Sequence, residues 1–435
     1  TICMLMQHEP WNPAWIRGGK LEDIVWIKKD VLAWCSGIHI VFLNIVQGTQ
    51  SIFWCWGHGT GEGARCLSAH NRLHVFAFAE RIIQPRIMVF AYRSMKKVSE
   101  CAGGCRLGYL ATAFTTGDHL ISIGTYPFFA ITVWNWKTGE KIQSVNTSLH
   151  DGVGQILKVT LDGPTVVAQM GKSLGKLYTW EVDVVEEMAI LKSKNYFGPL
   201  GSFGSWSEPL LAITDIDGHI YLCNYDGSDI YRIVLSQRCG TCLDLEAPIV
   251  AWFRDGIVLR TTFCQIRFYA RNIRTNMWRK QWYMKTETRP YILTSHPLRK
   301  DRFFYYTFEG YLMQIDFDEN GESPKVTRYL ENGATYRFVD FVYPWCHHLV
   351  ASCDTKELAI LEVYDGTFVT SIDLEVESDI LCQASHPDYP LIALGMGSGE
   401  LVLLSILDPM EPKVAAQLRL HRSPVDFIKF SHSGK

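Results

Sequence analysis

Hydrophobic residues along this chain alternate with polar ones, or form short unbroken runs, over stretches of about five to seven residues. The runs are rich in Val, Ile, Thr, Tyr and Phe, and turn-forming residues follow them. Few windows have hydrophobic residues at the spacing of one helix face. The pattern predicts an all-β protein, in which Glu186 to Lys194 is the best segment for a short helix or a loop insertion.

One plan of strands and turns repeats along the chain with a period of about 44 residues. Its clearest copy contains four expected strands, at Tyr109–Phe114, His119–Gly124, Ala130–Trp136 and Ile142–Val145. Four short strands joined by tight turns make one blade of a β-propeller. Both faces of these strands are apolar, so each blade has to pack between neighbouring blades.

Nine copies of this plan can be aligned, and Val425–Phe430 opens a tenth. The nine begin at or near Ile24, Ala64, Leu107, Gly152, Leu200, Leu243, Tyr291, Phe338 and Ile380. Propellers usually close with about four to eight blades, so ten repeats fit one ring and part of another. The prediction is a seven-bladed first propeller over residues 1–333 and the opening blades of a second over residues 334–435. Because Lys435 follows a turn signal and an unpaired blade is unfavourable, the chain is expected to be truncated.

The composition fits a globular protein with a large interior, since hydrophobic residues make up 47% and charged residues 20% of the chain. The formal net charge of -3 gives no general attraction to nucleic acid. The most basic stretches, Arg271–Lys285 and Arg299–Arg302, alternate with aromatic residues as the two faces of a strand would. No nucleic acid and no small-molecule substrate is therefore expected as a partner.

Cysteine usage and apolar runs bear on the location of the protein. The 13 cysteines are odd in number and scattered through strand-like runs, which favours reduced thiols inside the cell. No uncharged apolar run of about 18 residues occurs, so no membrane partner is expected. The first residues lack a signal-peptide pattern, although the start at Thr1 leaves room for a missing presequence. The expected location is cytoplasmic.

Two cysteine motifs are candidate metal ligands. Cys239 and Cys242 form the only CxxC, without the second pair or the nearby histidines that a zinc site needs. Cys346-His347-His348, with Cys353 five residues later, falls at an expected turn between two strands. Both motifs are better explained as structural turns, and no metal is predicted.

Two further motifs have the form of catalytic or phosphate-binding groups. Gly57–Gly63 is glycine-rich, but it lacks the Lys and Ser/Thr that reach the phosphates and precedes a strand instead of a helix. Asp215 and Asp217 fit the chemistry of a hairpin turn. No catalytic residue and no cofactor is predicted, and an enzyme with its site in the central channel stays as an alternative.

The segment Ile131–Gly139 resembles the end of a WD40 repeat, with Asn135 where that repeat usually has Asp. The fold class that this resemblance implies is an all-β, WD40-like β-propeller. In most other copies the Gly-His and Trp-Asp pairs that brace an ideal blade are missing, as at Ala359–Glu362 and around Leu403. These blades are expected to be less rigidly specified.

Several segments together resemble, in order and spacing, the amino-terminal region of the cilia- and flagella-associated WD-repeat proteins of the dynein tether. They are His39–Ile45, Val75–Glu80 with Gln84–Tyr92, and Ala130–Trp136. This family has two paralogous branches. The ending Trp134-Asn135-Trp136 and the segment from Asp379–Cys382 through Gly399–Ser405 favour one of them.

The resemblance implies a non-catalytic axonemal scaffold of cilia and sperm flagella, with amino-terminal propellers and a coiled-coil remainder. It implies three partners: the paralogous WD-repeat tether subunit, the inner-arm dynein heavy chain and proteins of the doublet microtubule. The alternative is a WD40 adaptor of another intracellular complex, in traffic or ubiquitin ligation. A coiled-coil continuation beyond Lys435 would favour the scaffold, and a helical solenoid would favour the adaptor.

Partner contacts are expected at aromatic and basic loop residues, because Trp and Arg are enriched at binding hot spots. The candidate partner-binding residues are Trp206, Arg271, Arg274, Trp278 and Arg279. They can equally be ordinary strand and turn residues, and the sequence does not decide which face of the propeller binds which partner.

Overall fold

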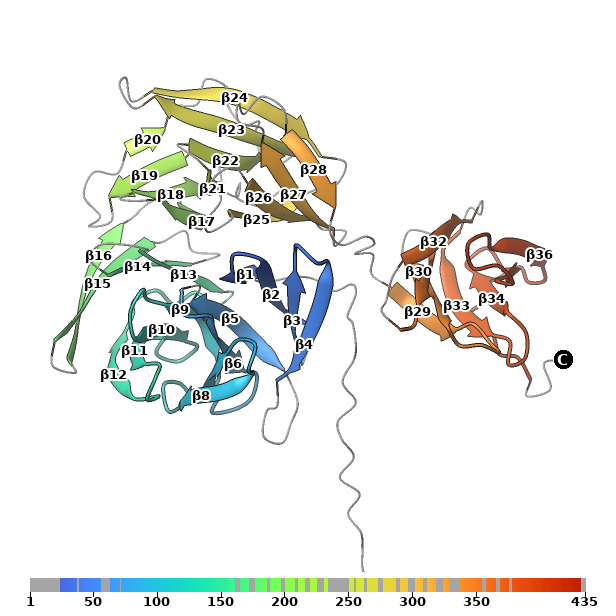
Figure 1. Cartoon of the computed structure of the whole chain (residues 1–435), viewed down its shortest axis with the longest axis horizontal. Helices are drawn as coiled ribbons and strands as arrows, with labels where there is room; N and C mark the ends of the chain where they lie inside the picture. Colours follow the sequence, from blue (N-terminus) through green and yellow to red (C-terminus); the bar gives the residue numbers. More distant parts are fainter. Residues whose placement is uncertain are drawn as a thin grey trace, which may run out of the picture. The chain divides into compact units, whose positions relative to one another are not determined.

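The structure is a computed structural model, and its described part consists of strands and the turns between them (Figure 1). It describes residues 24–36, 39–55, 63–70, 72–152, 154–160, 165–171, 177–185, 188–196, 200–207, 210–215, 220–224, 231–233, 250–253, 256–261, 264–272, 277–286, 290–295, 302–307, 311–317, 324–328, 336–353, 357–364, 368–374 and 378–431. Within these ranges no helix occurs, and none therefore is long and apolar enough to cross a membrane. The prediction of an all-β protein is confirmed.

The strands of the described residues form nine four-stranded antiparallel sheets, each a simple meander, and divide into two compact units. The larger unit comprises Leu21–Phe308 and Leu312–Tyr329 and holds seven of the sheets. Its first four sheets contain β1 (Ile24–Lys28), β2 (Val31–Ser36), β3 (His39–Asn44), β4 (Thr49–Trp54); β5 (Ala64–His70), β6 (Val75–Glu80), β7 (Ile87–Ala91), β8 (Lys96–Cys101); β9 (Tyr109–Phe114), β10 (His119–Gly124), β11 (Ala130–Asn135), β12 (Lys141–Asn146); β13 (Gln155–Val159), β14 (Val166–Gly171), β15 (Leu177–Val185) and β16 (Met188–Tyr196).

The other three sheets of the larger unit continue the same plan. They contain β17 (Leu200–Ser207), β18 (Leu210–Asp215), β19 (Ile220–Asn224), β20 (Tyr231–Ile233); β21 (Val250–Phe253), β22 (Gly256–Thr261), β23 (Gln265–Asn272), β24 (Met277–Lys285); β25 (Pro290–Ser295), β26 (Arg302–Thr307), β27 (Leu312–Phe317) and β28 (Pro324–Arg328). The seven sheets begin close to the first seven repeats that the sequence predicts.

The sheets of the larger unit follow one another around a ring. The first strand of each sheet contacts the first strand of the next, from β1 beside β5 through to β21 beside β25. Trp26 of the first sheet packs edge-on against Phe304 of the seventh, with ring centroids 5.1 Å apart. The two ends of the series therefore meet, as they do in a propeller.

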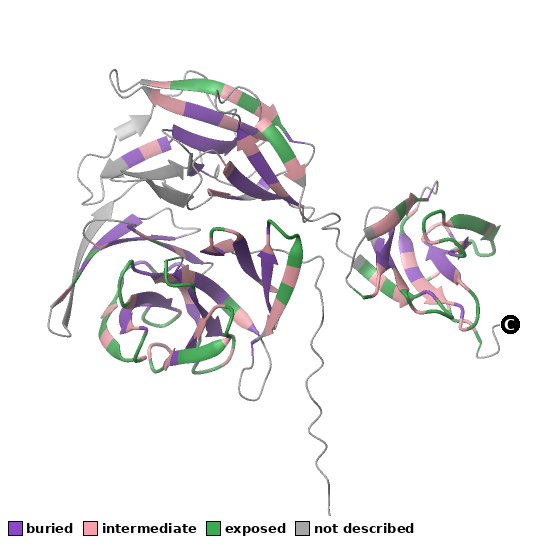
Figure 2. Cartoon of the chain, in the orientation of Figure 1, coloured by how far each residue is buried: buried purple, intermediate pink, exposed green. Residues whose placement is uncertain are grey.

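Middle strands such as β6, β10 and β14 are mostly hydrophobic, and residues on both of their faces are buried. All six residues of β6, from Val75 to Glu80, are buried, and Phe76 and Phe78 are the largest of them. The outermost strands β8 and β12 are mostly exposed or half-buried, and Figure 2 shows the same change from purple to green outward through the sheets. The core thus lies between sheets, and no single sheet could bury it alone.

One sequence expectation in this unit is wrong. Glu186 to Lys194 is expected as a helix or a loop insertion, but β16 covers Met188–Tyr196 and pairs with β15 from Leu177↔Tyr196 to Val185↔Met188. Pairing along nine residues satisfies backbone groups that a short helix would have to satisfy within itself. The two strands form a long hairpin.

The smaller unit, which holds the strands after Leu330, has two sheets. They contain β29 (Tyr336–Phe341), β30 (His348–Cys353), β31 (Glu357–Glu362), β32 (Phe368–Asp373); β33 (Ile380–Ser385), β34 (Leu391–Met396), β35 (Glu400–Ser405) and β36 (Lys413–Arg419). Facing side chains such as Val350, Ile360, Leu394 and Leu404 form one buried cluster between these sheets.

The expected first strand of a tenth repeat, Val425–Phe430, is not a strand in the structure. This segment lies along the ninth sheet instead, where the Val425 amide donates to the Met396 carbonyl at 3.1 Å. The Cys382 thiol donates to the Val425 carbonyl at 3.1 Å. Because these bonds reach strands of the ninth sheet one residue at a time, they form no ladder.

Candidate protein-binding site

Hydrogen bonds from buried tryptophans brace two of the sheets. In the third sheet, Trp134 is fully buried and its indole Nε1 donates to Ser122 Oγ at 2.8 Å. Asn135, next to it, accepts the amides of Lys137 at 3.0 Å and Thr138 at 3.3 Å. Asn135 therefore shapes the turn after β11 through its side-chain oxygen, the atom that Asn shares with Asp.

The fourth sheet has a different brace, which the WD40 sequence pattern does not predict. Trp180 Nε1 donates to Gln169 Oε1 at 2.8 Å, and Gln169 Nε2 donates to Gln155 Oε1 at 2.7 Å. Gln155 Nε2 in turn donates to the Leu149 carbonyl at 2.9 Å. This buried chain links three strands and the preceding loop, so the sheet is held firmly without the usual pairs.

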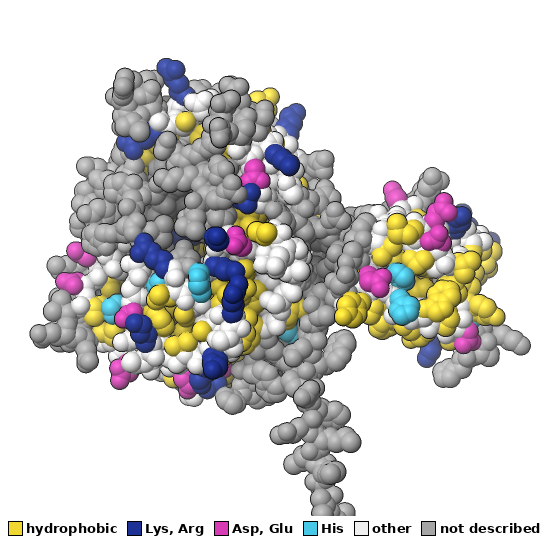
Figure 3. All heavy atoms as spheres, in the orientation of Figure 1, with side chains coloured by type: hydrophobic (Ala, Val, Ile, Leu, Met, Phe, Trp, Pro, Cys, Tyr) yellow, Lys and Arg dark blue, Asp and Glu magenta, His cyan; other side chains and the backbone are white. Residues whose placement is uncertain are grey.

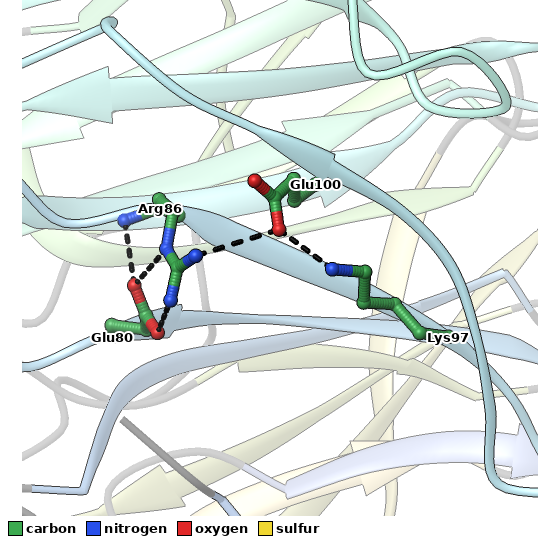
Figure 4. A network of polar contacts seen from close by, with 4 residues as sticks. All are labelled: Glu80, Arg86, Lys97 and Glu100. Carbon is green, nitrogen blue, oxygen red and sulfur yellow. Dashed lines mark hydrogen bonds and ion pairs between the residues drawn. The ribbon is translucent and has the colours of Figure 1, made fainter. Parts of the chain in front are cut away.

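An ion-pair network fixes the turn between β6 and β7 in the second sheet (Figure 4). Glu80, 1% exposed, accepts two bonds from the Arg86 guanidinium, from Nε at 2.9 Å and from Nη2 at 2.8 Å. Arg86 Nη1 also lies 3.5 Å from Glu100 Oε2, and Lys97 Nζ lies 2.7 Å from the same oxygen. The bond to Glu80 raises the pKa of Arg86, although burial lowers it. The fork geometry holds both ends of the turn in one conformation.

Three segments at this end of the second and third sheets are joined by backbone hydrogen bonds. They are the turn 81–86, the loop 102–108 and the turn 125–129. The Gln84 amide donates to the Arg106 carbonyl at 2.7 Å, and the Thr125 amide donates to the Gly108 carbonyl at 2.8 Å. We call the outward side of these segments, together with Arg65, the basic turn surface. It is a continuous, hydrogen-bonded rim and the best-formed candidate binding site among the described residues.

The structure brings together part of the predicted partner-binding set. Arg271 in β23 is the cross-strand partner of Trp278 in β24, and Arg279 is next to it and exposed. Trp278 packs partly against the core cluster of this region, which is a structural role. Trp206 lies in β17, and Arg274 lies outside the described residues. These five residues remain a prediction as partner contacts.

The motifs with candidate chemistry fall mostly outside the described residues, namely Cys239, Cys242, Asp217 and all of Gly57–Gly63 except its last glycine. Within the described ranges, no group of three or more His, Cys, Asp and Glu side chains is placed to hold a metal ion. His348 instead lies 3.2 Å from Glu362 on the neighbouring strand.

A cavity of about 330 Å³ opens among the first strands of the first four sheets, β1, β5, β9 and β13. Its lining mixes apolar residues such as Leu67 with the polar side chains of Ser68, Thr112 and Gln155, and Lys158 is the one charged residue among those that line it.

The smaller unit carries exposed hydrophobic side chains on its turns, seen in yellow in Figure 3. Trp345 is 53% exposed, Tyr364 85% and Tyr389 60%. Sequence reasoning missed these residues and the hydrophobic residues of the basic turn surface. The available signal was an aromatic or aliphatic residue beside Pro within a turn, as in Tyr126-Pro127-Phe128.

Four-stranded sheets in sequential order around a ring define a β-propeller of the WD40 type. Solved structures of this type are similar to the chain at the level of the fold. The crystal structure of the RRP9 WD40 repeats has a TM-score of 0.51 and 14% identity, covering 67% of this chain and 88% of that one. The structure of U3-55K has a TM-score of 0.51 and 14% identity, covering 67% and 90%. No protein-family model matches the chain.

Curated relatives confirm the resemblance to cilia- and flagella-associated proteins. Mouse cilia- and flagella-associated protein 43 is 23% identical over 97% of this chain, and mouse protein 44 is 25% identical over 47%. The Chlamydomonas reinhardtii protein 44 is 24% identical over 34%. The branch that the Trp134-Asn135-Trp136 ending favours is protein 43. The chain spans 28% of the length of the mouse protein 43 and 10% of that of the mouse protein 44.

Proposed function

We propose that this chain is part of an axonemal scaffold of cilia and flagella, which tethers inner-arm dynein motor heads to doublet microtubules through protein contacts. It acts without catalysis and pairs with a paralogous WD-repeat subunit. Its role is to fix the position of the motor, and axoneme assembly and ciliary motility depend on it.

The observation that carries this proposal is the similarity to a cilia- and flagella-associated protein along 97% of the chain. The propeller fold supports it, because a stack of sheets presents its turns as broad, rigid binding surfaces. The lining of the channel cavity, with Lys158 as its one charged residue, suits contact more than acid-base chemistry. The fold and the relatives both point to a non-catalytic scaffold.

The proposal includes two propellers. We assign residues 1–333 to the first, with seven blades, and residues 334–435 to the opening blades of the second. The division of the strands after Tyr329 supports this boundary. Limited proteolysis of the full chain tests it, with cleavage expected between β28 and β29. Protection of this segment, with cleavage inside β1–β28 instead, would contradict the assignment.

The function is tested in ciliated cells that express the protein from its own gene with an epitope tag. Cells are demembranated with detergent, and the axonemes are treated with a lysine cross-linker and analysed by mass spectrometry. The tagged protein is expected to stay with the axoneme and to cross-link to an inner-arm dynein heavy chain and to a paralogous WD-repeat protein.

Recovery only in the detergent-soluble fraction would overturn the axonemal assignment. Cross-links in that fraction to coat proteins or to ubiquitin-ligase subunits would support an adaptor of another complex. The tag expressed alone is the control for trapping in the axoneme.

A further inference from the structure

We propose that the basic turn surface binds an acidic protein segment that also carries hydrophobic side chains. The inference rests on the proposed function only in taking the chain to act by binding proteins, and it does not depend on the axonemal location. It names the chemistry of one partner contact and the residues that make it.

The first reason is hydrophobic exposure at this rim. Ile83 is 75% exposed, Tyr126 67%, Phe128 62% and Leu107 50%. They belong to the three segments that the Gln84 and Thr125 amides tie together, so they lie along one continuous surface. Large hydrophobic side chains that gather on a surface with basic neighbours are typical of protein interaction sites.

The second reason is the charge at this rim. Arg65, Arg81 and Arg106 are exposed, and none of them forms an ion pair with another described residue. The turn 81–86, the loop 102–108 and the turn 125–129 contain no Asp or Glu. Glu80, which comes just before the first turn, is buried and bonded to Arg86. Glu100, just before the loop, is partly exposed and is paired with Arg86 and Lys97. The surface is therefore positive, while the whole chain has a formal net charge of -3.

A positive surface on a chain of opposite overall charge selects for an acidic partner. Complementary charge raises the association rate and excludes partners of like charge, and exposed hydrophobic residues add affinity once the partner is seated. A partner that carries carboxylates and hydrophobic side chains together would satisfy both properties of the surface.

The third reason is that the surface is ordered before it binds. The two hydrogen bonds from the Arg86 guanidinium to the Glu80 carboxylate fix the first turn. The Phe129 amide donates to the Thr125 carbonyl at 3.2 Å and closes the third segment. A Cβ at Gly108 would lie 3.1 Å from Nη1 of Arg65, so this guanidinium rests against the loop. Binding to such a surface loses little conformational entropy in the loops.

Nucleic acid and lipid fit the surface less well. Single-stranded nucleic acid needs a basic groove with several aromatic stacking platforms, whereas aliphatic Ile83 and Leu107 occupy half of the hydrophobic positions here. Recognition of anionic lipid uses clusters of about four to eight Lys and Arg, and three exposed arginines fall short of that number.

The test measures binding of the full chain to a fluorescent random copolymer of glutamate and tyrosine. Poly-glutamate, poly(U) RNA and phosphatidylserine vesicles are measured in parallel. We expect the copolymer to bind most tightly, with affinity that falls as salt rises. Tighter binding to the RNA or to the vesicles, or no binding of the copolymer, would overturn the proposal.

Charge reversal locates the site. The double variant Arg81→Glu with Arg106→Glu is expected to bind the copolymer about tenfold more weakly. The matched control is Arg93→Glu with Lys96→Glu, because the turn between β7 and β8 is at the opposite end of the same sheet. The control is expected to keep wild-type affinity. Equal losses of affinity in the two double variants would mean that overall charge alone causes the effect, and they would refute the site.

The hydrophobic part is tested in the same assay. Ile83→Ser with Phe128→Ser is expected to lower affinity for the copolymer and to leave affinity for poly-glutamate unchanged. Val46→Ser is the control, since Val46 is 74% exposed at the opposite end of the first sheet. Far-ultraviolet circular dichroism of each variant shows that it folds. Because the assay uses purified chain, it can succeed even where the protein fails to stay with the axoneme.

Discussion

The rings of Trp26 and Phe304 meet edge to face, with centroids 5.1 Å apart and planes inclined at 68°. Trp26 lies in the first sheet of the larger unit and Phe304 in the seventh, so residues far apart in the sequence close the ring. Phe304 is fully buried and Trp26 is 8% exposed. The first and seventh sheets share no turn, so side-chain packing of this kind joins them.

The closing contact can be measured by a double-mutant cycle. Trp26→Leu and Phe304→Leu are each expected to lower the free energy of unfolding, and the two losses are expected to be non-additive by about 0.5–1.5 kcal/mol. Urea unfolding of the single and double variants gives the coupling energy. Strict additivity would mean that the first and seventh sheets are not coupled through these rings.

The brace in the third sheet gives a second prediction. Ser122→Ala removes the acceptor of the buried Trp134 indole and leaves its N–H unpaired, so it is expected to lower the free energy of unfolding by about 1–3 kcal/mol. Thr138→Ala is the control, in the turn after β11 of the same sheet, because Thr138 and Glu140 are both exposed and can exchange their 3.1 Å bond for bonds to water. Its cost is expected to be about 0.5 kcal/mol or less. Similar losses in both variants would argue against a special role for the indole bond.

The sequence predicts the sheets well because their signal is local. The runs Val75–Glu80 and Ala130–Trp136 show their strands by themselves, and turn residues mark where each strand ends. Repetition then predicts that sheets stack, since a strand such as β6 that is hydrophobic on both faces needs neighbours. Nine expected repeats accordingly correspond to nine sheets.

The errors come from tertiary contacts that a local pattern does not contain. The charged stretch Glu186 to Lys194 has weak strand propensity, but pairing with β15 makes its described part, from Met188 onward, a strand. Val425–Phe430 has strong propensity but makes only isolated bonds with the ninth sheet. The hydrogen bonds that link Trp180, Gln169 and Gln155 could not be predicted from the sequence, because Gln is not part of the usual WD40 brace.

The candidate site is harder to predict than the fold. Trp278 has the residue type of a hot spot, yet it packs against a core cluster. Ile83 and Leu107 have the residue type of a core, yet they are exposed. Sequence spacing does not give exposure in a turn, because exposure depends on which neighbouring loop covers it.

The Glu80–Arg86 pair gives a third prediction. Glu80→Gln is expected to lower the free energy of unfolding by about 3 kcal/mol, because it leaves a half-buried guanidinium without its carboxylate. Glu100→Gln is the matched control in the same network, and its loss is expected to stay below about 1 kcal/mol since its ion pairs are exposed. Thermal unfolding of both variants shows which substitution causes the larger loss of stability. A larger loss for Glu100→Gln would show that Arg86 depends more on Glu100 than on Glu80, which contradicts the prediction.

His70 gives a prediction about pH. It is buried beside Phe114 and Trp136, with ring centroids 5.8 Å and 6.2 Å away. Burial lowers the pKa of His70 below its usual 6.5, and the backbone of the turn at Thr116 and Gly117 raises it by less. As pH falls through about 6.5, His70 therefore takes up a proton in the unfolded chain while it stays neutral in the folded chain. Unfolding then takes up a proton, so stability is full above about pH 6.5 and is lost as pH falls towards the folded pKa.

The comparison is between wild type and His70→Gln, unfolded in urea at about pH 7.5 and about pH 5.5. His39 and His119 also have pKa values lowered by burial, and both remain in the variant. The wild type is expected to lose more stability than the variant between the two pH values, and the difference isolates His70. An equal loss in both proteins would mean that His70 takes up its proton without opening the contact to Phe114 and Trp136.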